Sequence, residues 1–149
     1  MAEDRTYVER NAEELERMRS LVEGMSDDDL RRQANEHWTI AGVLGHIAFW
    51  DGRNLALAEK LEHDVPFTES DNEPEDVDWI NDATRPLIHA VPPSELARLA
   101  LQIAQDTDGK MASLPEQRMY PKDPSSPINA SRADHRAEHL DDIEAALES

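Results

Sequence analysis

The sequence predicts an all-α fold, a four-helix bundle with long connections. Three observations predict it. Apolar residues recur at helical spacing along most of the chain, the alternation typical of strands is nearly absent, and only five glycines occur among 149 residues. Hydrophobic residues make up 38% of the chain, so the core has to be built from helical stripes. The length suits one domain spanning residues 1–149.

The apolar stripes predict four main helices, at about 4–24, 39–62, 94–113 and 130–147. Thr39 is placed to cap the second of them, and Asn129 or Ser131 the last. Asp51 falls on the apolar stripe of the second helix and conflicts with its pattern. Gly42 and Gly45 cost this helix roughly 1 kcal/mol each relative to alanine, and we expect them to permit close approach of a neighbouring helix.

Two shorter helical segments and two connections complete the prediction. A short helix through 30–34 follows Ser26, which is followed by three acidic residues and can cap it. A second segment covers 76–88, where Pro86 is expected to kink or end the helix. Proline-containing stretches at 63–75 and 114–129 are expected to be surface connections.

The net charge of the chain argues against two classes of binding partner, nucleic acids and membranes. Asp and Glu number 33 against 15 Lys and Arg, a net charge of −18. Such a surface repels phosphate backbones and anionic membranes, so we expect no nucleic-acid partner and no membrane partner. There is no cysteine, which excludes disulfides and thiolate catalysis. The first 14 residues are polar and charged, and the expectation is a cytoplasmic protein.

Histidines supply the candidate metal ligands. His135 and His139 are four residues apart on a predicted helix, so both lie on one face with Cβ atoms roughly 5–6 Å apart. Two imidazoles at that spacing can bind one transition metal, and a third from another helix, such as His46, leaves a coordination position open. From the spacing alone, a solvated histidine pair and a core His46 remain the alternatives.

Two segments around these histidines resemble the DinB superfamily (the DinB/YfiT type). Residues 38–51, WTIAGVLGHIAFWD, resemble its second-helix signature, and residues 134–144, DHRAEHLDDIE, resemble its closing His-x-x-x-His helix. Asn81 matches a further recurrent position. The resemblance implies a four-helix bundle that forms a homodimer. It also implies that His46, His135 and His139 bind one divalent metal, which is zinc, nickel or iron in different members.

The best-understood members of the family use low-molecular-weight thiols, as isomerases and S-transferases. The resemblance therefore implies a metal-dependent enzyme that acts on a small molecule by thiol transfer or hydrolysis. Because the chain has no cysteine, the thiol would be a cosubstrate. Asp51 and Asp142 are candidate partners of the ligand imidazoles, Trp50 a candidate pocket residue and Arg53 a candidate contact for an anionic substrate. Surface acids, a packing tryptophan and a surface salt bridge from Arg53 are the alternatives.

Two other functions compete with the enzyme. One is a non-catalytic, metal-binding or stress-associated helical dimer, which predicts a bound metal without turnover. The other is a helical interaction protein with incidental histidines, which predicts no metal. The enzyme predicts one tightly bound metal and turnover of an electrophile with a thiol.

Overall fold

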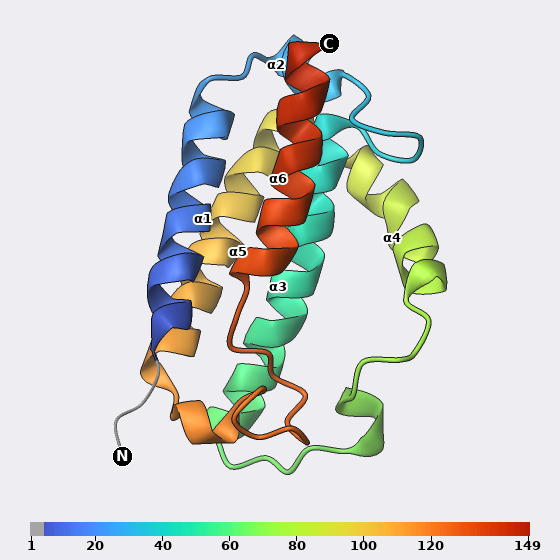
Figure 1. The fold of residues 1–149 in the computed structure, drawn as a ribbon. Helices are drawn as coiled ribbons and strands as arrows, with labels where there is room; N and C mark the ends of the chain where they lie inside the picture. Colours follow the sequence, from blue (N-terminus) through green and yellow to red (C-terminus); the bar gives the residue numbers. More distant parts are fainter. Residues whose placement is uncertain (1–4) are drawn as a thin grey trace.

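The computed structural model describes residues 5–149, and within this range every regular element is helical (Figure 1), so the all-α prediction is confirmed. The α-helices are α1 (Thr6–Glu23), α2 (Asp27–Arg31), α3 (Ile40–Glu62), α4 (Asp78–Ala90), α5 (Pro93–Ser113) and α6 (Ala133–Glu148). The predicted start of the first helix, near Asp4, lies outside the described residues.

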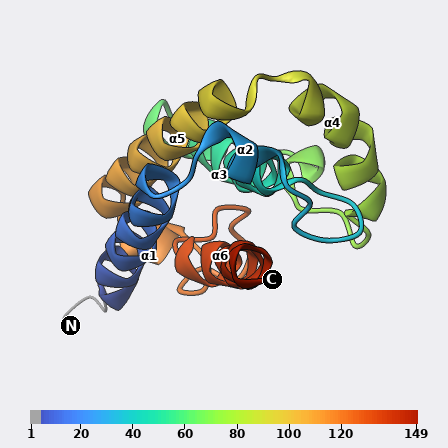
Figure 2. The same ribbon diagram turned by 90° about the horizontal axis from the view of Figure 1, so that it is seen from above.

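The four long helices contact one another in a ring. Helix α5 packs between α1 and α3, and α6 contacts the same two helices from the other side. Figure 2, which looks along the helices, shows α4 set apart from α1, on the outer side of α3. Helix α2 contacts α3 and α5. Among residues 5–149, none of these helices has the length and hydropathy needed to cross a membrane.

Helix α3 is the most buried element and supplies much of the core. Thr39 caps it as predicted, since its hydroxyl accepts a hydrogen bond from the Gly42 backbone N–H at 2.9 Å. One apolar cluster packs around the first half of α3, against α1, α5 and α6. A second cluster, with Met111, Met119 and Ile128, surrounds its last turns.

The glycines of α3 allow α4 to approach closely, as expected. A Cβ atom at Gly42 would lie 2.5 Å from Nε2 of His89, and one at Gly45 would lie 2.5 Å from Cγ2 of Ile88. Both neighbours are side chains of α4, so a larger residue at either position would force those side chains to move. Helix α4 itself has no fully buried residue.

The structure corrects three helix boundaries. Ser26 does begin α2, through a capping box with Asp29, but the helix covers 27–31 and not 30–34. Helix α4 continues through Pro86 to residue 90. Helix α6 begins at 133 and not at 130; its N-cap residue is Arg132 rather than Asn129 or Ser131, and the Arg132 side chain makes no capping hydrogen bond.

A residue far away in the sequence sets the start of α6. The Oδ1 atom of Asn11, on α1, accepts hydrogen bonds from the backbone N–H groups of Arg132 at 2.7 Å and Ala133 at 3.0 Å. Its side-chain amide donates to the carbonyl of Ala130 at 3.0 Å. These bonds hold 130–132 outside the helix and satisfy N–H groups that a helix start leaves free.

Candidate metal centre

The three predicted histidines converge between two neighbouring helices. His46 projects from α3, and His135 and His139 project from α6. One ligand nitrogen from each lies within 4.8 Å of the others. The ring centroids are 4.6 Å apart for His46 and His139, 4.7 Å for His135 and His139, and 5.3 Å for His46 and His135. The cluster therefore has the compactness needed to coordinate one ion.

Burial keeps these imidazoles neutral. It lowers the pKa of His46 to about 4, with smaller contributions from the charges of His139 and Arg85. Burial also lowers the pKa of His135, with smaller contributions from His139, His46, Arg132 and Arg136, and burial lowers that of His139. Near pH 7 all three side chains are in the neutral form that coordinates a metal.

The hydrogen bonding of the cluster fits a bound ion. Among the described residues, the buried Nδ1 atoms of His46 and His135 have no hydrogen-bond partner. Buried polar atoms without partners are rare in folded proteins, and a coordinated ion is one of the few explanations for them. Asp142 lies 3.9 Å from Nδ1 of His139, within ion-pair range but too far for a hydrogen bond. Three neutral imidazoles suit zinc, nickel or iron.

Asp51 is fully buried and binds Arg136 of α6 and Arg132, which immediately precedes that helix. Its carboxylate accepts from Nε of Arg132 at 2.9 Å and from Nε of Arg136 at 3.2 Å. Arg136 also binds Asp108 of α5 at 2.7 Å, and burial raises the pKa of that second carboxyl. Among the described residues, the carboxylate of Asp51 therefore hydrogen-bonds to arginines and to no imidazole, and this network of four charges fixes α6 against α3 and α5.

Trp50 and Arg53 line the approach to the histidines. The Nε1 atom of Trp50 donates to Oδ1 of Asn81, on α4, at 3.0 Å. Arg53 donates to the backbone carbonyl of Asp71, and its guanidinium carbon lies 6.0 Å from the centre of the Trp50 ring. Arg53 therefore anchors the connection between α3 and α4.

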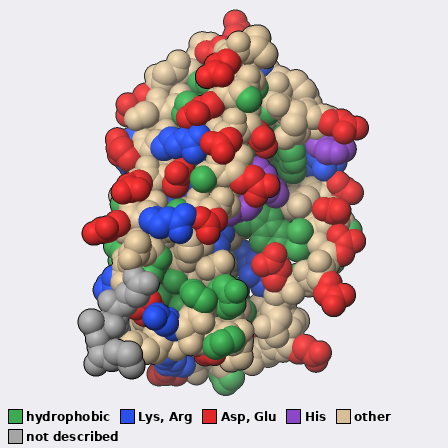
Figure 3. All heavy atoms as spheres, in the orientation of Figure 1, with side chains coloured by type: hydrophobic (Ala, Val, Ile, Leu, Met, Phe, Trp, Pro, Cys, Tyr) green, Lys and Arg blue, Asp and Glu red, His purple; other side chains and the backbone are tan. Residues whose placement is uncertain are grey.

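A cavity of about 380 Å³ opens beside the histidines. Figure 3 shows histidine side chains in a hollow between α6 and the side that carries α4, on a face where acidic side chains are widespread. Besides the three histidines, the cavity is lined by Trp50, Arg53, Asn54, Glu73, Val77, Asn81, Pro127, Asn129 and Arg132. Its volume is that of a small-molecule site.

The sequence prediction missed the two arginines. Arg132 and Arg136 are one helical turn apart and flank His135, but nothing in their spacing separates a buried arginine from a surface one. The residue in the sequence that could have indicated these arginines is Asp51. A carboxylate on an apolar stripe has to be paired with a cation when the stripe is buried, which predicts an arginine or lysine on a facing helix.

The lowered pKa values predict how pH affects the stability of the metal-free protein. In the unfolded chain the histidines take up protons near pH 6.5, whereas His46 in the folded protein stays neutral until about pH 4. The free energy of unfolding therefore has its full value above pH 6.5. It falls as the pH decreases, because the unfolded chain takes up protons that the buried histidine does not. Between pH 6.5 and 5, the loss amounts to about 1.5 kcal/mol for His46.

Urea unfolding with a chelator present, at several pH values, checks this. The free energy of unfolding of His46→Gln should fall less steeply over the interval than that of the native protein, by about 1.5 kcal/mol. Identical slopes for the two proteins would contradict the assignment of His46 as a buried neutral group.

Comparison with known proteins agrees with the geometry. No curated protein and no solved structure gives a significant match to the chain. The sequence profile of the DinB superfamily does match, over residues 11–148, which include all three clustered histidines. The match covers nearly the whole chain, and the chain therefore belongs to the DinB superfamily.

Proposed function

We propose that this protein is a metal-dependent enzyme of the DinB type that acts on a small molecule, by thiol transfer or by hydrolysis. His46, His135 and His139 would hold one divalent transition metal. The observation that carries the proposal is the convergence of three neutral imidazoles, His46 buried and the other two partly buried, with ligand nitrogens within 4.8 Å of one another, in the wall of a cavity of about 380 Å³.

The number of protein ligands favours catalysis over a structural role. Structural zinc sites are closed by four protein ligands, whereas catalytic sites have three and keep a position open. When bound, a divalent metal supplies a Lewis acid that lowers the pKa of a coordinated water or thiol. Among the described residues, the group of candidate ligand atoms within 4.8 Å of one another consists of these three histidines, without a fourth member.

The chain's own residues would hold and shield the substrate. Trp50 provides an apolar wall, fixed by its hydrogen bond to Asn81. Helix α4 supports that wall from outside α3. The cavity contains no cysteine, since the chain has none, so any thiol in the reaction would enter as a cosubstrate. The single-domain organisation and the cytoplasmic location stay predictions from the sequence.

Elemental analysis of protein purified without chelator tests the proposal. The native protein should contain about one zinc, nickel or iron ion per chain. His46→Ala and His135→Ala should lose it, because two imidazoles bind a metal far more weakly than three. His63→Ala is the matched control, since His63 is exposed at the end of α3 and outside the cavity, and it should keep the metal.

The outcomes separate the competing functions. A metal that both cluster variants lose, together with turnover in a screen of thiols against electrophiles, supports the enzyme. A metal without turnover supports the non-catalytic metal-binding protein instead. A native protein that neither contains nor takes up a divalent ion would contradict both and leave a helical interaction protein.

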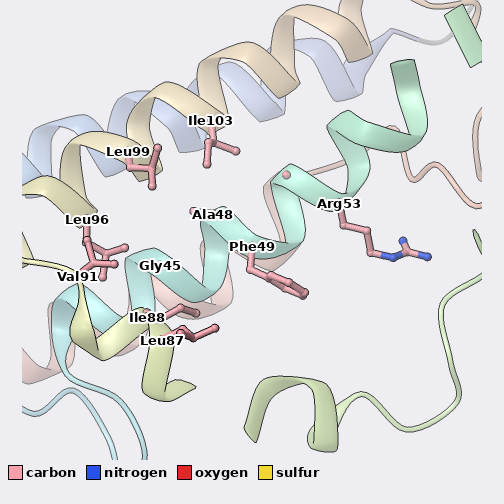
Figure 4. A pocket seen from close by; sticks show the side chains of 11 residues that line it. Gly45, Ala48, Phe49, Arg53, Leu87, Ile88, Val91, Leu96, Leu99 and Ile103 are labelled. Atoms are coloured by element: carbon pink, nitrogen blue, oxygen red, sulfur yellow. The ribbon is translucent and has the colours of Figure 1, made fainter. Parts of the chain in front are cut away.

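We also propose that the protein forms a homodimer through an apolar groove between α3, α4 and α5. Figure 4 shows Leu96, Leu99 and Ile103 of α5 opposite Ala48 and Phe49 of α3, with Ile88 and Leu87 of α4 at one end. The groove measures about 460 Å³, and Leu87 is 75% exposed. A second copy fits such a surface, because a two-fold interface pairs the same apolar patch on both subunits and removes it from water.

Sedimentation velocity over a range of concentrations tests the dimer. Leu87→Glu should shift the native dimer towards the monomer, because it places a charge in the groove. Val65→Glu also introduces a glutamate, at an exposed apolar residue outside the groove, and should leave the dimer intact. A native protein that stays monomeric, or equal effects of both substitutions, would contradict this interface.

A further inference from the structure

The cavity beside the histidines contains an arginine that is only partly used by the protein. Arg132 lies at the start of α6, three residues before His135, and its side chain is 9% exposed. Its Nε atom donates to Asp51 at 2.9 Å. The structure gives its two terminal amino groups no hydrogen-bond partner among the described residues, and Arg132 lines the cavity. One edge of the guanidinium is therefore held by the protein, and the other remains for a ligand.

Asn81 and Asn129, which line the same cavity, each have a side-chain NH₂ group that is free to donate. Oδ1 of Asn81 accepts from Trp50 Nε1, and Oδ1 of Asn129 accepts from the backbone N–H of Ser131. With their oxygens occupied, each presents an NH₂ group that no described residue accepts from. Asn54 differs, because both ends of its amide bind the backbone of Asn129.

The charges around the cavity favour an anion despite the acidic chain. The protein has a net charge of −18, yet the cavity lining holds two guanidinium groups, Arg53 and Arg132, against one carboxylate, Glu73. The carboxylate of Asp51 lies behind the lining, where Arg132 and Arg136 share it. A divalent metal on neutral ligands would add two positive charges to the same site.

We propose that Arg132, with the side-chain amides of Asn81 and Asn129, binds the carboxylate of a small-molecule substrate or cosubstrate in the histidine-lined cavity. The guanidinium edge that carries the two terminal amino groups (the two-amino edge) can donate one hydrogen bond to each oxygen of a carboxylate. Asp51 fixes the guanidinium before the ligand arrives, so little side-chain entropy is lost on binding. This inference rests on the proposed function, since it names the chemical class of molecule that the same site takes.

Calorimetric titration with a matched pair of thiols tests the proposal. The probes are 3-mercaptopropionate and its neutral amide, which differ only in the group that Arg132 would bind. The zinc-loaded native protein should bind the acid at least about tenfold more tightly than the amide. Arg132→Gln should reduce that ratio to near one. Arg98→Gln, which removes an exposed arginine of α5 paired with Glu95, should keep the native ratio.

Using the ratio within each protein cancels a general effect of the substitution on the metal or the fold. Arg132→Lys is the second variant if the glutamine variant does not fold. It keeps a cation beside Asp51 but loses the two-amino edge, so its ratio should fall below the native one. A native protein without preference for the acid, or a preference that survives both substitutions, would overturn the proposal.

A metal-free titration separates this inference from the proposed function. Propionate added to the apoprotein should shift the guanidinium NMR signal that is missing from Arg132→Gln. If the protein takes up no metal but this signal shifts, the metal-dependent function fails and the anion site stands. If metal binds but the signal does not move and the thiol pair shows no preference, the anion site fails and the metal centre stands.

Discussion

The buried carboxylate of Asp51 is the interaction on which the rest of the site depends. It is fully buried on α3 and binds Arg132 and Arg136, which lie on either side of His135 at the start of α6. A buried charge without partners is so unfavourable that the two helices have few other ways to pack, and removing one partner of such a pair typically costs about 3–5 kcal/mol. Asn11 adds a second link between helices, because its side chain, on α1, caps the start of α6.

The Asp51–arginine pairs and the Asn11 cap determine where the histidines lie. Once α6 is fixed against α3, the turn that carries His135 and His139 faces His46, with ring centroids within 5.3 Å. In the same contact, the two edges of the Arg132 guanidinium have different roles. Its Nε edge stabilises the fold, and its other edge lines the cavity. Structural and ligand-binding roles therefore meet in one side chain, which is why a mutational test has to compare two ligands within each variant.

The sequence predicted the features that depend on local spacing. Apolar periodicity located the long helices, Thr39 marked the start of α3, and the four-residue spacing of His135 and His139 placed both on one face. It could not predict that α6 begins at 133, because the cap comes from Asn11, 121 positions before Arg132. Nor could it pair Asp51 with its arginines, since that pairing arises only when α3 and α6 pack together.

The most direct test of this account is the metal affinity of Asp51→Asn, measured by competition with a chelator under conditions where circular dichroism shows it folded. The account predicts an affinity for cobalt or zinc at least about tenfold weaker than that of the native protein, because the asparagine cannot hold both arginines and the imidazoles lose their fixed arrangement. Asp106→Asn removes the same charge at an exposed site of α5 and should bind as the native protein does. An unchanged affinity in Asp51→Asn would contradict the claim that the buried carboxylate assembles the metal centre.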